Sequence, residues 1–461
     1  MKLIVNKFEK IVGSDLVASV YEDKVARPIL NVAGEELGAD VAYDLGYDGQ
    51  GSVIAVLDSG VDSNHPMFQG AIISEACFST NGYNGKVTSN CPGGVTGYVG
   101  PGAASVCGQN SCDHGTRVSS IAMGRPYVVN GIEYKGIAYQ AGLIAVQVFS
   151  TVNDAALCNG WPVPCQQAWA SDIEEGLNWV ISNVATIPQI ASVNISIGGE
   201  LYQSECTNDV LEDEIVHLKY VANVATVIGA GNNGSSSAVS WPSCIRDAVA
   251  VRAAYKPTGF AGHAIESFAN RHPDLVDVMS INRARTAYPG GGIDPGIGWG
   301  TSFAAPHVAG AFAILKQMNS YAYVSDIEGV LGNTAGSVVD YSTNISYPLV
   351  NMAAASEFFH DRPIARFDRS FYVLEQGKQR AFSAYRSANP VSSPLTYTWD
   401  KGDGTASVPT LDAEIGMQYA EPGRYVARLT VSNGLKTSEE VDVGVRVYTR
   451  RTLNAVLISI R

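Results

Sequence analysis

The sequence predicts an α/β fold with a mostly parallel sheet covered by helices on both faces, followed by a small all-β sandwich. Five short apolar runs rich in β-branched residues recur with helical or irregular stretches between them, as expected of strands buried on both faces. After about residue 355 the pattern changes to short alternating strands separated by turn residues. Hydrophobic residues form 46% of the 461 residues and charged residues 16%, which excludes wholesale disorder.

The predicted strands of the parallel sheet are each bounded by glycine, polar residues or helical stretches. They span Val53 to Leu57, Leu143 to Phe149, Val193 to Ile197, Val224 to Ile228 and Ala248 to Val251. One helix between them is well marked, because Ser171-Asp-Ile-Glu174 has the spacing of a capping box. Its apolar side chains then fall on one face, at Ile173, Leu177, Val180 and Ile181.

A second helix is expected to begin near Ser302. Its buried side is marked by apolar residues at helical spacing, Val308, Phe312 and Leu315. Pro306 is compatible with this helix if it lies in or near the first turn, where a missing N–H has no intrahelical partner to lose.

The chain from about Pro363 onward reads as a β-sandwich of about 85 residues. The run from Tyr425 to Val431 alternates apolar and polar residues, and turn residues flank it at Glu421-Pro-Gly423 and Ser432-Asn-Gly434. This region has no cysteine, so it depends on its own core. The final stretch, Thr452 to Arg461, is apolar enough for one more strand.

Charge and hydropathy exclude two classes of partner. The 44 acidic and 31 basic side chains leave a formal net charge of −13, and no run rich in Lys and Arg stands out, so we expect no nucleic acid partner. No uninterrupted apolar stretch reaches roughly 18 residues, so we expect no membrane span.

All eight cysteines lie in the first part of the chain, and none forms the tight Cys-x-x-Cys pair of a zinc site. Their even number and loop-like settings favour disulfides and an oxidising compartment, with reduced thiols as the alternative. Many pairings are possible, and proximity in the sequence favours Cys77 with Cys91, Cys107 with Cys112, Cys158 with Cys165 and Cys206 with Cys244.

Three segments place different reactive side chains at the ends of predicted elements. Asp58 ends a buried strand, His114 precedes a glycine and an apolar stretch, and Ser302 stands at the start of a helix, where free N–H groups favour developing negative charge. Together they supply what acyl transfer requires: a hydroxyl nucleophile, an imidazole base and a carboxylate that orients the base. Asn232, in Gly229-Ala-Gly-Asn232-Asn-Gly234, can donate an amide hydrogen bond to an oxyanion.

Each segment alone has a plainer interpretation. An aspartate at a strand end is often a turn former, Gly-Thr-Ser is often a helix cap, and Gly-Asn-Asn-Gly is often a turn. Their coincidence in one chain favours the catalytic interpretation.

The four segments, in the order Asp, His, Asn, Ser, resemble the subtilisin-like serine proteases (subtilases, peptidase family S8) over about residues 37 to 355. The resemblance implies a secreted serine endopeptidase that hydrolyses extracellular proteins through an acyl-enzyme. Asp58, His114 and Ser302 match the catalytic triad and Asn232 the oxyanion residue. It implies no cofactor for catalysis, while structural calcium is possible at sites the sequence does not identify.

The segment of Ser196, Ile197, Gly198 and Gly199 looks like the substrate-binding strand of the family. Its backbone would pair with an extended protein or peptide substrate, a mode of recognition that reads main chain more than side chain. The rival hypothesis is a catalytically silent subtilase scaffold that delivers the β-sandwich to a surface.

Three residues depart from the family pattern. Arg117 stands where relatives usually have histidine, and Phe303 replaces the methionine that usually follows the serine. Met67 occupies a position where many subtilases carry a calcium-binding aspartate, which argues against calcium there. Two cysteine-containing segments, between Asp58 and His114 and from Cys158 to Cys165, look like insertions and are expected to form stapled loops at the rim of the substrate cleft.

The flanking regions also carry resemblances. Residues 4 to about 30 resemble the last strand and tail of the inhibitory prodomain, which predicts a zymogen; a simple N-terminal arm is the alternative. The first residues lack the apolar run of a secretory signal, so we expect the chain to begin inside a longer precursor, unless export uses another route. The region from Pro363 to Val447 resembles a PKD domain, an immunoglobulin-like sandwich, through Tyr397-Thr-Trp-Asp400-Lys-Gly-Asp403-Gly404.

Such a domain would bind insoluble protein or polysaccharide, or act as a spacer, and Trp399 is expected to belong to its core. The predicted division of the chain is therefore a prodomain remnant or arm at 1–36, the subtilisin-like catalytic domain at 37–355, a linker at 356–362, the PKD-like sandwich at 363–448 and a tail at 449–461.

Overall fold

A computed structural model of the protein describes residues 32–108, 112–187, 189–257, 262–294, 296, 298–341, 343–450 and 452. Two predictions fall outside this part of the chain: the prodomain-like segment at residues 4 to about 30, and the last strand from Thr452 onward, of which only Thr452 is described.

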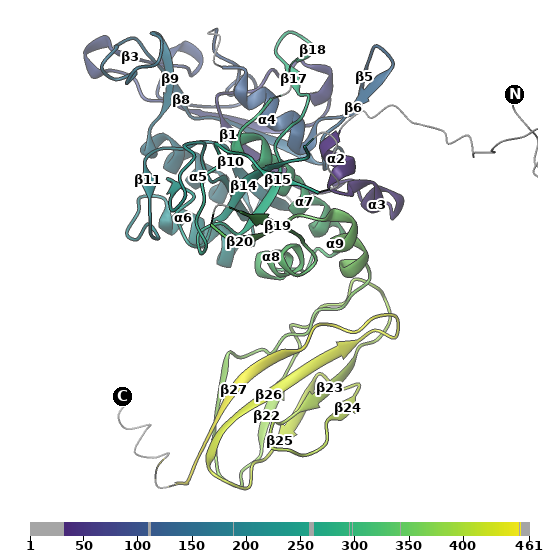
Figure 1. Ribbon diagram of the computed structural model, residues 1–461. Coiled ribbons are helices and arrows are strands. Elements are labelled where there is room, and N and C mark those ends of the chain that lie inside the picture. Colours follow the sequence, from purple (N-terminus) through teal and green to yellow (C-terminus); the bar gives the residue numbers. More distant parts are fainter. Residues whose placement is uncertain are drawn as a thin grey trace, which may run out of the picture. The chain divides into compact units, whose positions relative to one another are not determined.

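A large, mostly parallel sheet forms the centre of the first part of the chain (Figure 1), which confirms the predicted fold class. Its neighbouring strands from β20 to β2 run parallel, while β19 and β4 add antiparallel edges. Short β15 (Ala264–Ile265) pairs with β14. The order across the sheet is β19 (Gly336–Asp340), β20 (Ile345–Leu349), β16 (Val278–Ile281), β14 (Val249–Tyr255), β12 (Ala225–Gly229), β10 (Ile190–Ile195), β1 (Val53–Asp58), β7 (Gly142–Gln147), β2 (Ile72–Phe78) and β4 (Gly97–Val99).

Helices cover both faces of this sheet. Gly176 of one helix packs on Leu57, whereas Gly115 of another packs against Asp58. Because successive residues of a strand point to opposite faces, these two helices, α5 and α4, lie on opposite sides. The helices are α2 (Val32–Glu36), α3 (Ala39–Asp44), α4 (His114–Met123), α5 (Ala170–Asn183), α6 (Glu212–His217), α7 (Thr301–Met318), α8 (Val324–Asn333) and α9 (Met352–Phe359). Among the described residues, none of these helices is long and apolar enough to cross a membrane.

Two of the predicted strands end earlier than expected. The predicted run from Leu143 to Phe149 is split into β7 and β8 (Phe149–Val152), because the amide of Gln147 donates to Ser59 O at 2.9 Å and accepts from the Phe149 N–H at 2.7 Å. Of the predicted strand from Val193 to Ile197, only the part up to Ile195 is a strand, as the end of β10. Both interruptions occur at the carboxyl edge of the sheet, where the site residues are expected.

The predicted capping box of α5 is wrong. The helix begins at Ala170, one residue before the predicted cap, and the N-cap residue Trp169 makes no side-chain capping bond. Asp172 instead accepts hydrogen bonds from the N–H and hydroxyl of Thr80 at 2.9 and 3.1 Å. The apolar face agrees with the prediction, since Ile173, Leu177 and Val180 are buried.

The predicted position of Pro306 in the first turn of α7 is also wrong, because the helix begins at Thr301 and Pro306 is inside it. A proline at this position leaves the carbonyl of Ser302 without its helical partner. Ser196 supplies the missing donor, with its hydroxyl 2.8 Å from Ser302 O. The predicted buried face holds, since Val308, Phe312 and Leu315 are fully buried.

The C-terminal region is an all-β sandwich with its own core of buried apolar side chains. It contains a five-stranded sheet and a two-stranded sheet. No strand of either pairs with a described strand of the main sheet. Trp399 is 1% exposed and packs edge-on against Phe367, as expected of a core residue. The strands are β21 (Phe371–Glu375), β22 (Arg380–Ser383), β23 (Thr396–Asp400), β24 (Val408–Thr410), β25 (Glu414–Met417), β26 (Gly423–Ser432) and β27 (Val441–Tyr448).

Several small elements surround the main sheet. β8 lies in a three-stranded sheet between β3 and β9. Short 3-10 turns span Pro66–Phe68, Tyr83–Gly85 and Pro92–Gly94, and a π turn spans Leu218–Ala222. The remaining short strands are β3 (Val87–Ser89), β5 (Tyr127–Val129), β6 (Ile132–Tyr134), β9 (Cys165–Ala168), β11 (Leu201–Tyr202), β13 (Val239–Ser240), β17 (Ala287–Tyr288) and β18 (Gly292–Ile293).

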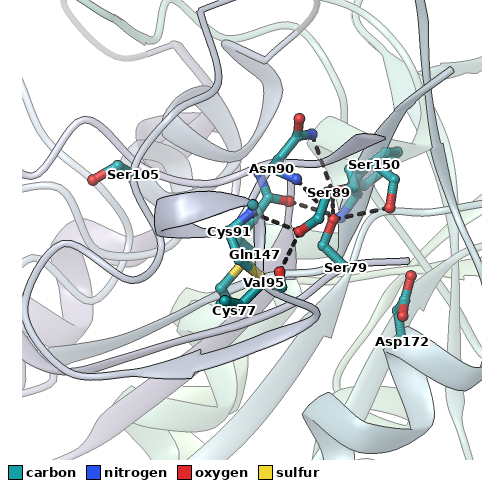
Figure 2. The surroundings of a disulfide bond; sticks show 12 residues. Cys77, Ser79, Ser89, Asn90, Cys91, Val95, Ser105, Gln147, Ser150 and Asp172 are labelled. Atoms are coloured by element: carbon teal, nitrogen blue, oxygen red, sulfur yellow. Dashed lines mark hydrogen bonds between the residues drawn. A yellow bond between two sulfur atoms is a disulfide. The ribbon is translucent and has the colours of Figure 1, made fainter. Parts of the chain in front are cut away.

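The prediction that the cysteines form disulfides is confirmed, and each cysteine pairs with its neighbour in the sequence: Cys77 with Cys91, Cys107 with Cys112, Cys158 with Cys165 and Cys206 with Cys244. The first bond lies beside a network of short polar side chains (Figure 2). There, Ser79 Oγ lies 2.9 Å from Ser150 Oγ, and the Asn90 N–H donates to Ser79 Oγ at 2.9 Å. The disulfide and this network together attach β3 and β8 to the main sheet.

We expect the Cys206–Cys244 disulfide to contribute most to stability among the described pairs, because it closes the longest loop, with a sequence separation of 38. Replacing both cysteines by alanine should lower the free energy of unfolding by about 4 kcal/mol, measured by urea denaturation. The matched control is the Cys158–Cys165 pair, with a separation of 7, whose removal should cost about 2 kcal/mol. Equal losses for the two double variants would contradict this ranking.

Candidate active site

Asp58 ends strand β1 with its carboxylate buried at the carboxyl edge of the sheet. Its side chain is 1% exposed. Such a buried charge requires hydrogen-bond donors, and two are present: the Ser59 N–H, 2.7 Å from Oδ1, and the His114 ring. Gln147, at the end of the neighbouring strand β7, holds the carbonyl of Ser59 and so fixes the turn that follows Asp58.

His114 is the first residue of α4 and pairs with this carboxylate. Its Nδ1 lies 2.8 Å from Asp58 Oδ1 and 3.0 Å from Oδ2. Because a carboxylate only accepts, Nδ1 carries the proton and Nε2 of the neutral ring is left as a base. Burial would lower the pKa of His114, but the charge and hydrogen bond of Asp58, assisted by Asp113, outweigh burial and raise that pKa above its usual value.

Ser302 is the second residue of α7, where the first N–H groups of the helix have no partners within it. Its side chain is half-buried. α7 packs against α4, and the ring of Phe303 meets the ring of His114 edge-on at 5.9 Å between centroids. The described residues include no hydrogen bond between the His114 ring and the Ser302 hydroxyl, so this contact has to form before a proton can pass between them.

Asn232 is held against the first turn of α7. Its Oδ1 accepts from the Thr301 N–H at 2.8 Å and from the Thr301 hydroxyl at 3.1 Å. The oxygen of the amide is thereby occupied, and Nδ2 is the atom that can donate to a substrate. The turn requires glycine at position 231, where φ is +101° and a Cβ would lie 2.1 Å from Ser240 Oγ.

The predicted substrate segment of Ser196, Ile197, Gly198 and Gly199 follows β10 but belongs to no regular strand. Ser196 is buried and holds the Ser302 carbonyl, whereas the two glycines are exposed. The Gly199 N–H donates to Trp241 O at 2.8 Å. One side of the segment is therefore occupied by the chain around Trp241.

Sequence reasoning missed Thr301, which connects two parts of the site. Its hydroxyl accepts from the Gly231 N–H at 3.0 Å and donates to Asn232. The signal in the sequence that could have identified Thr301 is its position between Gly300 and Ser302. In the second cysteine-containing segment, β9 begins at Cys165 and runs directly into the start of α5.

A cavity of about 380 Å³ adjoins His114 on the side of Phe303. It is lined by Asp113, His114, Arg117, Asp294, Gly298, Trp299 and Phe303. Its walls therefore combine two carboxylates, one guanidinium and aromatic rings.

Two other histidines in motif segments serve structure. His65 is fully buried; its Nδ1 accepts from the Met67 N–H and its Nε2 donates to Gly292 O at 2.8 Å. His307 donates to Phe303 O at 2.7 Å, and burial lowers its pKa to about 4, so it stays neutral.

Met67 is buried and supplies no oxygen ligand from its side chain. In the described part of the chain, no three His, Cys, Asp or Glu side chains gather into a group that could hold a metal ion.

Comparison with known proteins shows which families the two parts of the chain resemble. The profile of the subtilase family matches residues 49–370, and that of the PKD domain matches residues 360–447. Subtilisin E of Bacillus subtilis is 27% identical over 348 residues, covering 74% of this chain and 76% of its own. Subtilisin BL of Lederbergia lenta is 30% identical over 319 residues, covering 69% and 95%. The structure of a protease from Pseudoalteromonas arctica aligns with a TM-score of 0.52 at 25% identity, covering 70% of this chain and 94% of that one.

We expect Asp58→Asn to lower the pKa of His114. The reason is that the substitution removes the charge that raises this pKa and leaves burial, which lowers it. NMR titration of the histidine ring carbons in Ser302→Ala protein measures the change, with His272 as an internal reference. A pKa that is unchanged or higher in the variant would contradict the assignment.

Proposed function

We propose that this chain, which belongs to the subtilase family and is a serine endopeptidase, hydrolyses peptide bonds through an acyl-enzyme on Ser302. The observation that carries the proposal is the pairing of His114 with the buried Asp58 at 2.8 Å, beside the helix start that bears Ser302. Asn232 supports it, because its amide is oriented by Thr301 at the same helix start.

In the first half of the reaction, Ser302 Oγ attacks the scissile carbonyl carbon and His114 Nε2 takes the hydroxyl proton. The imidazolium formed is stabilised by Asp58, which accepts from Nδ1–H. The oxygen of the tetrahedral intermediate takes the negative charge and is bound by Asn232 Nδ2 and the Ser302 N–H. The C–N bond then breaks, and the leaving amine receives the proton from His114.

Hydrolysis of the acyl-enzyme repeats these steps with water as the nucleophile. His114 removes a proton from water, the oxyanion forms again in the same site, and the proton returns to Ser302 Oγ as the ester bond breaks. These steps balance without a cofactor.

Substrate binding is proposed to use main chain on the exposed side of Ser196 to Gly199. The chain around Trp241 occupies one side of this segment, so an extended peptide can pair with the other. β9 is an edge strand of its small sheet, and we propose that the stapled segment containing it forms another wall of the cleft. Recognition through main chain favours broad specificity.

Secretion and the partner of the C-terminal domain are proposals as well. The four disulfides favour an oxidising, extracellular environment. The PKD-like domain is proposed to bind insoluble protein or polysaccharide through its surface, since the buried Trp399 offers no stacking platform. A catalytically silent scaffold is the less favoured function, because every residue of the proposed mechanism is present.

Ser302→Ala should abolish both labelling by a fluorophosphonate and measurable hydrolysis of a casein substrate, because the nucleophilic oxygen is lost. Gel fluorescence after labelling, together with release of acid-soluble peptides, measures the two effects. Undiminished labelling of Ser302→Ala would refute the proposed nucleophile, and absence of labelling in the unaltered protein would favour the silent scaffold.

Asn232→Ala provides a graded comparison. It should retain fluorophosphonate labelling while kcat falls roughly 100- to 1,000-fold with little change in KM, because only transition-state binding is lost. Steady-state kinetics on a chromogenic peptide measure both constants, and a rise in KM with unchanged kcat would contradict the assignment to the oxyanion.

Phe303 should make activity tolerant of peroxide, because phenylalanine at this buried position beside His114 cannot form a sulfoxide. Phe303→Met should lose activity faster than the unaltered protein during incubation with hydrogen peroxide. Residual hydrolysis against time measures this, and Phe303→Leu is the control for the change in packing. Equal rates of inactivation for Met and Phe at this position would refute the idea.

A further inference from the structure

Arg117, which replaces the histidine usual in the family, lies in an ion-paired cluster next to His114. Its Nε contacts Asp113 Oδ2 at 2.6 Å, and its Nη1 contacts Asp294. The guanidinium also lies over the ring of Tyr288, 5.2 Å from the centroid. The side chains of Arg117, Asp113 and Asp294 are only 17–21% exposed, so solvent screens these contacts less than it does on an open surface.

This cluster joins the helix that carries His114 to the segment that leads to Ser302. Asp113 and Arg117 belong to the start of α4, whereas Asp294 precedes α7 in the chain. The hairpin β17–β18, which ends just before Asp294, packs on α4 (Figure 1), and the Ala287 N–H donates to Ser120 Oγ at 3.0 Å. α4 is thus already attached to the hairpin β17–β18. The ion pair between Arg117 and Asp294 extends this attachment toward the turn before Ser302.

The cluster also sets the charge around the His114 ring. Asp58 faces the ring from β1, and Asp113 and Arg117 face it from its own helix. α7 contributes the apolar Phe303, and Asp294 lines the same cavity from the preceding segment. Beyond Trp299, Glu266 and Arg283 pair with each other at 3.0 Å and add no net charge.

We propose that Arg117 is a positioning residue for the reaction, which holds the helix of His114 against the segment before Ser302 and offsets the carboxylates beside the imidazole. The inference rests on the proposed function, since it concerns the alignment of the same side chains. Without Arg117, the carboxylates of Asp113 and Asp294 would remain in the cavity with no cation between them, and the cluster would become more negative by the charge of the guanidinium.

The charge of Arg117 determines in which direction the pH profile of activity should shift when this residue is replaced. His114 must be neutral to accept the proton of Ser302, so activity is lost as the pH falls through its pKa. Arg117 lowers this pKa and Asp113 raises it. Removing the guanidinium should therefore move the acidic limb of kcat/KM to higher pH.

The test compares four variants with the unaltered protein by kcat, KM and the acidic limb on a fluorogenic peptide. Arg117→Met should lower kcat roughly tenfold and raise the limb by roughly half a pH unit, because both the attachment and the charge are lost. Asp294→Asn should lower kcat and leave the limb nearly unchanged.

Two further variants separate charge from attachment. The double variant Arg117→Met with Asp113→Asn should return the limb toward its original position while kcat stays low. Arg117→Lys should keep the limb and lose part of kcat, because a lysine cannot bridge both carboxylates.

Arg246→Met is the matched control, since Arg246 is an exposed arginine paired with Glu205 at 2.7 Å, and it should match the unaltered protein. Unchanged kcat in both Arg117→Met and Asp294→Asn would overturn the positioning role. A limb that does not move in Arg117→Met, or stays displaced in the double variant, would overturn the charge role.

NMR titration of His114 in Ser302→Ala protein, with and without Arg117→Met, gives the same comparison without turnover. It therefore separates failure of this inference from failure of the proposed mechanism. If Arg117→Met does not fold, as judged by circular dichroism, Arg117→Gln takes its place as the test of the charge role, and Asp294→Asn still tests the positioning role.

Discussion

The contact between Asp58 and His114 is the constraint around which the site is organised. A carboxylate that is 1% exposed is stable as an anion only if donors surround it, and the Ser59 N–H and the His114 ring are those donors. The imidazole must therefore stay at this distance, which fixes where α4 begins relative to β1. The same contact determines the tautomer that leaves Nε2 available, so a requirement of folding also leaves this nitrogen free for the role of base that is proposed for it.

Much of this arrangement can be predicted from the sequence because it depends on local patterns. The apolar run before Asp58 identifies a buried strand, and a carboxylate at its end must lie at the carboxyl edge of a parallel sheet. The helical spacing of Val308, Phe312 and Leu315 identifies α7 and places Ser302 at its start. These features survive in the fold because any arrangement that displaced them would expose the apolar faces or bury polar groups without partners.

What the sequence does not predict are contacts between a side chain and backbone that is distant along the chain. Ser171 and Glu174 have the spacing of a capping box, yet the helix begins at Ala170. The side chain of Asp172, between them, instead binds Thr80, which lies on a different segment. Gln147 continues an apolar run, yet its amide ends β7 by binding Ser59 O and the Phe149 N–H. In each case the competing partner exists only once the sheet has formed, so local propensity gives no indication of it.

Pro306 shows how such a contact can join substrate binding to catalysis. The proline removes one donor from α7, and the carbonyl left free belongs to Ser302 itself. Ser196 Oγ fills the gap at 2.8 Å, and because it accepts from Asn194 Nδ2 at 2.9 Å its own proton is directed to Ser302 O. A residue of the proposed substrate segment is thus hydrogen-bonded to the backbone of the proposed nucleophile. Displacement of that segment would disturb Ser302 directly. Under the proposed function, the interruption of the helix therefore couples the position of the bound peptide to the position of the attacking oxygen.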